Sequence, residues 1–110
     1  PSVEEGLGQV VIEAMACGVP VVYAASGGPV ELVGEEAGTG VPHPVSWERQ
    51  QPPAPADLAA GVDRVLADHA RYRVEARRRA VERFALQPWL ERHGELFAEL
   101  LGQASRPPAL

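Results

Sequence analysis

The chain has 110 residues, of which 45% are hydrophobic and 23% are charged, with a net charge of −5 at neutral pH. This composition is typical of one small globular domain or part of a larger one, and it excludes a disordered or fibrous protein. An acidic chain without a basic tract argues against general nucleic-acid binding, a single cysteine excludes a disulfide framework or a cysteine-built zinc site, and no apolar run reaches the roughly 20 residues that cross a bilayer.

The front half predicts an alternation of helices and strands. From the amino end we expect a loop, a helix, a strand, a short helix and a short strand, over residues 1–8, 10–17, 19–24, 29–33 and 38–42. Gly18 is placed to close the first helix in the left-handed conformation. The first strand is a β-branched run between turn signals, as in a buried parallel sheet. Two strands are too few for an independent sheet, so earlier strands are expected to be absent.

The rear half predicts helices behind a proline-rich loop. Residues 43–55 are expected to form that loop, and apolar spacing predicts helices over residues 57–69, 71–84 and 88–101. The arginine run of the middle helix is expected to be a solvated face with pairs such as Glu75–Arg79. The apolar side chains of the last helix, including Trp89 and Phe97, are expected to pack in a core or against another domain. Any exposed part of that face would promote association.

The ionisable residues indicate origin and completeness. All ten basic residues are arginine and none precedes Arg49, whereas residues 1–48 hold seven acids. Arginine without lysine reflects the codon bias of a GC-rich genome, so we expect a bacterial protein. Because no signal peptide is visible, we expect it in the cytoplasm. Pro1 stands where a start methionine is normally found, so we expect a processed chain, an excised piece or a fragment.

Residues 5–13, Glu-Gly-Leu-Gly-Gln-Val-Val-Ile-Glu, carry the pattern that most suggests chemistry. Gly6 and Gly8 allow a tight turn, and the first amides of the following helix carry the positive end of its dipole, so a phosphate can bind without a basic side chain. Glu13 lies about 7.5 Å further along the helix, where its carboxylate can accept hydrogen bonds from a ribose. Glu5 faces whatever lies beyond the phosphates. For an isolated pair of acids, a solvated helix residue beside a simple turn is the commoner explanation.

The wider context contains five short motifs at close spacing, namely Pro1-Ser2, Glu5-Gly6-Leu7-Gly8, Glu13-Ala14-Met15-Ala16-Cys17-Gly18, Pro20-Val21-Val22 and Gly27-Gly28-x-x-Glu31. In this order they resemble the C-terminal domain of retaining glycosyltransferases with the two-domain GT-B fold, in particular family 4 (glycosyl transferases group 1). The resemblance is dense over about residues 1–41 and looser over residues 57–101. It implies an α/β fold, a partial Rossmann-like C-terminal domain with a few parallel strands followed by C-terminal helices.

The resemblance also implies a ligand and roles for individual residues. The donor substrate would be a nucleotide diphosphate sugar, linked to UDP or GDP, with no cofactor and no metal. Glu5 matches the acid that contacts the donor sugar near the reacting centre, and Glu13 matches the acid that binds the ribose. The loop and helix start whose amides approach the sugar and the diphosphate are matched by Gly6, Leu7, Gly8, Gln9 and Val10. Leu7 stands where the family usually has Phe, which preserves an apolar contact.

Some parts that the resemblance implies have no counterpart in these 110 residues. They are an Arg and a Lys that hold the diphosphate, and the N-terminal domain that contacts the acceptor. We therefore expect the donor-binding portion of an enzyme that moves a hexose to a hydroxyl acceptor, inactive by itself. Peripheral membrane association of the parent enzyme is compatible with this. The alternative is a non-catalytic α/β nucleotide-binding or interaction module.

On this basis we divide the chain into a nucleotide-sugar-binding βα segment with the E-x7-E motif, a proline-rich loop, C-terminal helices and a tail, over residues 1–44, 45–56, 57–102 and 103–110.

Two other interpretations, each of a single residue, are weaker. A dinucleotide fingerprint would need a third glycine where Val11 stands. Cys17 is expected to be a small buried residue, since nothing places a histidine beside it as a nucleophile would need.

Overall fold

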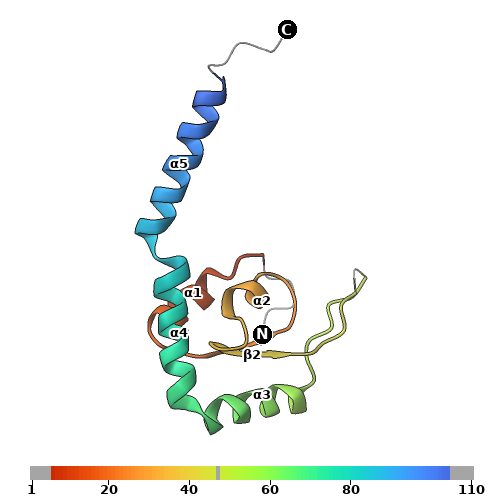
Figure 1. Ribbon diagram of the computed structural model, residues 1–110. Helices are drawn as coiled ribbons and strands as arrows, with labels where there is room; N and C mark the ends of the chain where they lie inside the picture. Colours follow the sequence, from red (N-terminus) through yellow and green to blue (C-terminus); the bar gives the residue numbers. More distant parts are fainter. Residues whose placement is uncertain (1–5, 47, 105–110) are drawn as a thin grey trace.

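The computed structural model describes residues 6–46 and 48–104, and within them seven elements follow one another (Figure 1). They are α1 (Gln9–Ala16), β1 (Val21–Ala24), α2 (Gly28–Val33), β2 (Gly38–Val41), α3 (Pro55–Ala67), α4 (His69–Phe84) and α5 (Leu86–Ala104). The predicted α/β class is confirmed, and every predicted helix and strand is present with slightly shifted ends, while residues 1–5 of the predicted first loop lie outside the described residues. The predicted tail is wrong at its start, because α5 continues to Ala104, and residues 105–110 lie outside the described residues.

The two strands form a parallel pair with α2 between them in sequence. Val21 is opposite Gly38 and Ala24 is opposite Val41. The amide of Ala25 donates to the carbonyl of Val41 over 2.9 Å, which extends the pairing by one residue. The carboxyl ends of both strands therefore lie at the same edge of the sheet.

Helices cover both faces of this small sheet. On one face Met15 of α1 and Val33 of α2 are fully buried, and Tyr23, Ala76 and Ala80 are buried in the same cluster. The two alanines lie four residues apart on α4, and their small side chains allow that helix to pack closely on α1. On the other face α3 approaches through a glycine: a Cβ on Gly61 would lie 3.0 Å from methyl carbons of Val22 and Val41. Packing on both faces fixes the strand ends, and with them the loops that follow.

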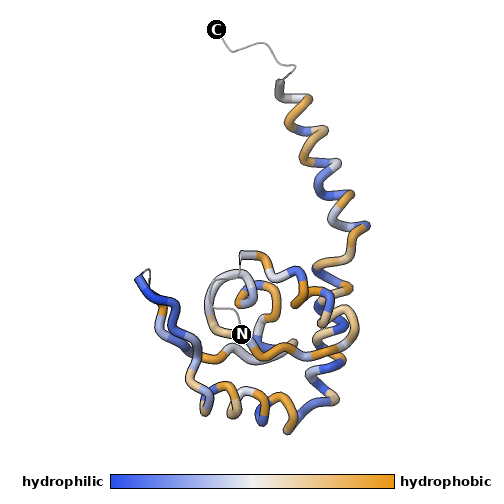
Figure 2. Tube along the Cα trace, turned by 180° about the vertical axis from the view of Figure 1, so that it is seen from behind, coloured by the Kyte–Doolittle hydropathy of each residue, from blue (hydrophilic) through white to orange (hydrophobic). Residues whose placement is uncertain are grey.

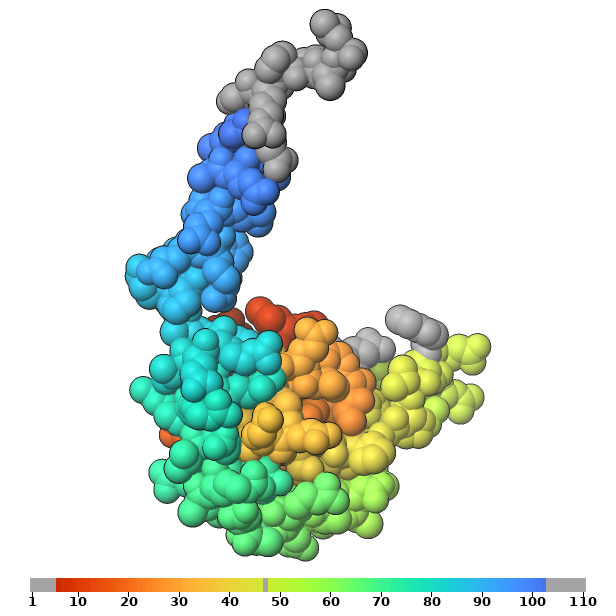
Figure 3. Space-filling model, viewed as in Figure 1, coloured from red at the N-terminus to blue at the C-terminus, as the bar shows by residue number. Residues whose placement is uncertain are grey.

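The last helix, α5, stands clear of this body (Figures 1 and 3). Its large apolar side chains are 47–70% exposed, and they are Leu86, Trp89, Leu90, Leu96, Phe97, Leu100 and Leu101. Hydrophobic and hydrophilic residues alternate along it in Figure 2. The radius of gyration is 18.5 Å, against about 13 Å for a globular domain of this length. Of the two expectations for these side chains, packing in a core is wrong for the described chain, where they form an exposed apolar face, and packing against another domain stays a prediction. No helix of residues 6–46 and 48–104 is long and apolar enough to span a bilayer.

Candidate functional site

The starts of α1 and α2 lie side by side at two glycine turns. Gly8 precedes α1 in the left-handed conformation, with φ 76° and ψ 53°, and its carbonyl accepts the amide of Val11 over 2.9 Å. Gly28 begins α2 directly against the other loop: a Cβ there would overlap the carbonyl of Gly6 and lie 3.0 Å from the carbonyl oxygen of Leu7. Only glycine at position 28 allows the two turns to touch, so the residue type determines the shape of the site.

The electrostatics of the α1 start favour an anion. Gly8 offers no side chain to cap the helix, and no acidic residue lies in its first turn. Among the described residues, no local carboxylate therefore neutralises the positive end of the α1 dipole. The turn before α2 follows the carboxyl end of β1, the edge at which open α/β sheets bind ligands. A phosphate group fits such a position.

The structure places most, but not all, of the predicted site residues. Gly6, Leu7 and Gly8 lie at the turn, and Gln9 and Val10 form the first turn of α1 with exposed side chains. The Glu13 side chain is exposed on the same helix and makes no hydrogen bond or ion pair with another described residue. Glu5 lies outside the described residues. The structure therefore supplies the turn and one of the two predicted carboxylates.

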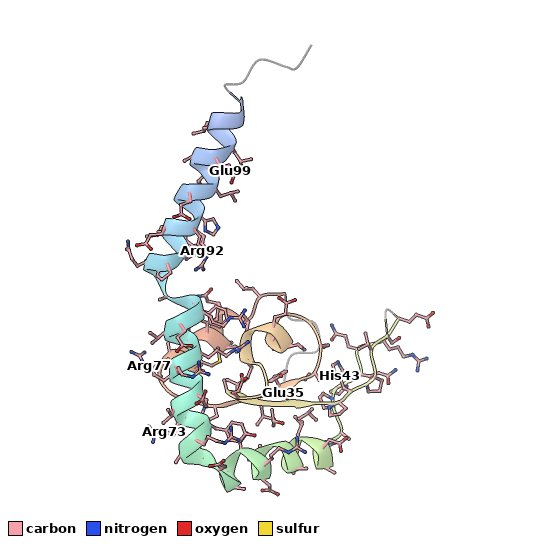
Figure 4. The ribbon with its side chains drawn as sticks, in the orientation of Figure 1. Glu35, His43, Arg73, Arg77, Arg92 and Glu99 are labelled. Atoms are coloured by element: carbon pink, nitrogen blue, oxygen red, sulfur yellow. The ribbon has the colours of Figure 1, made fainter. Side chains whose placement is uncertain are left out.

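A serine and a histidine that the sequence analysis did not assign also meet at this edge. The Ser26 hydroxyl lies 3.3 Å from Nε2 of His43, which Figure 4 labels. The other ring nitrogen, Nδ1, is buried and has no hydrogen-bond partner in the described part of the chain. Each residue follows its strand by two positions, since β1 ends at Ala24 and β2 at Val41. Because the carboxyl ends of parallel strands lie at the same edge of a sheet, the equal spacing of Ser26 and His43 from their strands could have predicted that they meet.

Two arginines of α4 hold the opposite ends of the two site helices. Arg77 donates to the carbonyl of Ala16, the last residue of α1. Arg79 is only 13% exposed, and it donates from Nη2 to the carbonyl of Glu31 over 2.8 Å and from Nε to the carbonyl of Leu32 over 2.6 Å, both in α2. Guanidinium groups are favourable at helix carboxyl ends, where free carbonyls and the negative end of the dipole lie. One helix therefore anchors both elements whose other ends form the candidate site.

This arrangement overturns the expected Glu75–Arg79 pair. Glu75 instead pairs with Arg78 over 2.7 Å, and Arg78 also reaches Glu82 over 2.5 Å. Arg78 points to solvent, while Arg79 lies on the face of α4 that packs against α2. Spacing along a helix gives the neighbours on one surface, but it does not decide which surface is covered.

The expectation for Cys17 is also wrong, because its side chain is exposed. α1 ends at Ala16, and Gly18 turns the chain with φ 70°, as predicted, so the cysteine lies at the outer corner. It lines an open pocket with Arg73 and Arg77, both labelled in Figure 4. Among residues 6–46 and 48–104, no cluster of histidine, cysteine or carboxylate side chains is arranged to hold a metal.

Two parallel strands joined by a helix, with a glycine turn beyond the carboxyl end of β1, are typical of part of a Rossmann-like α/β domain. The sequence profile described as glycosyl transferases group 1 matches residues 1–84, so the chain belongs to this glycosyltransferase family. Over 68 residues the chain is 43% identical to an uncharacterized glycosyltransferase of Methanocaldococcus jannaschii. The aligned part is 62% of this chain but only 15% of that relative, so the chain spans a small part of its length. A search of solved structures gave no match.

Proposed function

We propose that this chain is the donor-binding portion of a retaining, GT-B-type glycosyltransferase of family 4. The reaction would transfer a hexose from a nucleotide diphosphate sugar to a hydroxyl acceptor. The observation that carries the proposal is the meeting of two helix starts at glycine turns, within the segment that matches the family profile. This point lies at the carboxyl edge of the sheet, where open α/β sheets bind ligands, and within residues 6–46 and 48–104 no side chain caps α1 there.

Each described residue of the turn then has a role. The diphosphate lies against the backbone amides at the start of α1, which follow Gly8. Glu13 lies about 7.5 Å further along the helix axis and accepts hydrogen bonds from the ribose hydroxyls. Glu5 orients the donor sugar, a role proposed from sequence alone. The apolar side chain of Leu7 flanks the sugar.

We also propose that the chain binds the donor weakly and does not transfer the sugar by itself. In this reaction negative charge develops on the leaving diphosphate, and stabilising that charge supplies much of the rate. The described donor segment provides backbone amides but no cationic side chain, since the first basic residue in the sequence is Arg49. Detection of sugar transfer by the purified chain would contradict this part of the proposal.

Binding is tested by titrating UDP and GDP against the 15N-labelled chain and following the amide resonances of residues 8–10. We expect a saturable shift with one or both nucleotides. Glu13→Ala should weaken binding by about tenfold or more, because it removes a charge-assisted hydrogen bond to the ribose. Glu95→Ala, which removes an exposed carboxylate on α5, is the matched control. A missing saturable response, or one that Glu13→Ala leaves unchanged, would remove the proposal.

A further inference from the structure

A cavity of about 390 Å³ lies beside β2, where α3 and α4 meet. Its wall includes Tyr23, Glu35, Gly38, Gly40, Arg64 and Tyr72. Glu35 and Gly38 lie at the amino end of β2, whereas the glycine turns lie beyond the carboxyl ends of the strands (Figure 4 labels Glu35). The cavity shares no residue with the proposed donor site, and its volume is in the range of small-molecule pockets.

The inner wall of the cavity is the open edge of a strand. The carbonyls of Ala37 and Val41 accept the amides of Val21 and Ala25, over 3.4 and 2.9 Å, so these positions of the second strand face the first. Backbone direction alternates along a strand, so Gly38 and Gly40 direct their amides and carbonyls away from β1 and toward the cavity. In the described part of the chain β2 pairs with β1 alone. A small ligand can therefore hydrogen-bond to backbone donors and acceptors there.

A buried phenol adds a side-chain donor. Tyr23 is 8% exposed, and its ring fills the space beside Gly40, where a Cβ would lie 3.2 Å from the ring carbons. Burial, and secondly the negative charge of Glu35, raise the pKa of the Tyr23 phenol, while the positive charge of Arg79 opposes them. The hydroxyl is therefore protonated at neutral pH. It has no hydrogen-bond partner among the described residues, so it is available to donate to a ligand.

Charged groups of both signs line the same cavity. Arg64 of α3 is exposed, and its Nη1 donates to the Thr39 hydroxyl over 3.2 Å. A guanidinium carries five N–H donors, so most of them remain available. Neither Arg64 nor Glu35 forms an ion pair with another described residue. A simple anion bound here would be repelled by the carboxylate of Glu35, and a simple cation would be repelled by the guanidinium of Arg64.

We propose that this cavity is a second binding site, for a small zwitterion of the amino-acid class. The carboxylate of the ligand pairs with the Arg64 guanidinium and accepts the Tyr23 hydroxyl. Its ammonium group pairs with the Glu35 carboxylate and donates to the outward carbonyls of the glycine edge. A zwitterion matches both charges, whereas an anion or a cation satisfies one and is repelled by the other.

The test is a titration of the 15N-labelled chain with a panel of standard L-amino acids, followed by the amide resonances of Gly38 and Gly40. We expect a saturable shift in the millimolar range for at least one of them. Arg64→Gln should weaken binding by about tenfold, and Tyr23→Phe, which keeps the ring and removes only the hydroxyl, by several-fold. Arg92→Gln, on the distant α5, should leave binding unchanged (Figure 4).

Titrations with acetate and with ethylamine test the two charged groups of the ligand separately, because acetate carries only the carboxylate and ethylamine only the ammonium group. We expect neither to saturate in the range where the amino acid does. Equal saturation by acetate would contradict the proposal that the ligand is a zwitterion. The proposal would also fail if no amino acid of the panel gave a saturable shift, or if Arg64→Gln left the response unchanged. Glu13→Ala should preserve amino-acid binding while it weakens nucleotide binding, so failure of this site and failure of the donor site are distinguishable.

Discussion

Arg79 of α4 donates a hydrogen bond from Nε to the carbonyl oxygen of Leu32, 2.6 Å away near the carboxyl end of α2. A second bond from Nη2 to Glu31 makes the attachment two-pronged. The opposite end of α2 begins at Gly28, whose backbone lies against Gly6 in the candidate phosphate turn. A side chain in the rear helix thus sets the position of a helix whose start forms part of the site.

Replacing this arginine should destabilise the fold. Arg79→Ala removes two charge-assisted hydrogen bonds from a largely buried side chain, and we expect the free energy of unfolding to fall by about 2–3 kcal/mol. Urea unfolding measures the loss. Arg78→Ala is the matched control, since Arg78 forms only exposed ion pairs on the same helix and should change stability far less. If both variants lost the same free energy of unfolding, the hydrogen bonds from Arg79 to α2 would contribute no more to stability than the exposed ion pairs of Arg78.

A methyl group at the glycine contact should disturb the site directly. In Gly28→Ala the new Cβ overlaps the Gly6 carbonyl, so we expect a loss of about 1–3 kcal/mol and a weaker response to UDP or GDP. Gly94→Ala meets open space within α5, which stands clear of the body, so this matched control should leave the unfolding of the body and the nucleotide response unchanged. Calorimetric unfolding and nucleotide titration test both variants. Unaltered nucleotide binding by Gly28→Ala would show that the contact between the turns is not required.

Stability should fall at alkaline pH through Tyr23. Burial raises the pKa of its phenol in the folded chain above the ordinary value near 10, so above that pH the folded state binds more protons than the unfolded state. Its contribution is therefore complete below about pH 10 and is lost as the pH rises through the folded-state pKa. The chain has no lysine to titrate in the same range. Urea unfolding from about pH 9 to about pH 11 should show this fall, and a fall of the same size in Tyr23→Phe would rule Tyr23 out as its origin.

Removing α5 should leave the body intact. Residues 86–102 of α5 include no buried side chain, and the apolar face of the helix is exposed. We therefore expect the chain without residues 86–110 to keep the unfolding midpoint of the whole chain. The whole chain should associate as its concentration rises, and the shortened one should not, because the exposed apolar face is gone. Sedimentation velocity measures association, and a large drop in the midpoint on deletion would reveal contacts that stabilise the body.

Much of the fold and part of the site are predictable from local sequence. The β-branched run before Ala24, the glycine at position 18 and the apolar spacing of the rear helices each favour one conformation through neighbours a few residues away. The glycine turn before α1 is likewise determined by residues close together in the sequence, and its motif also indicates the family. These predictions hold because backbone sterics and side-chain periodicity act over one or two turns.

What the sequence by itself determined is therefore the order of elements, the α/β class and the turn proposed to bind phosphate. Only the tertiary structure decided that Arg79 reaches the end of α2, that Ser26 meets His43, that Cys17 is exposed and that α5 stands clear of the body. Arg79 and Leu32 are 47 residues apart, and Ser26 and His43 are 17 apart. Side chains so distant along the chain meet only after the helices have packed on the sheet. Which face of a helix is covered depends on that packing, and not on the residues that precede or follow it.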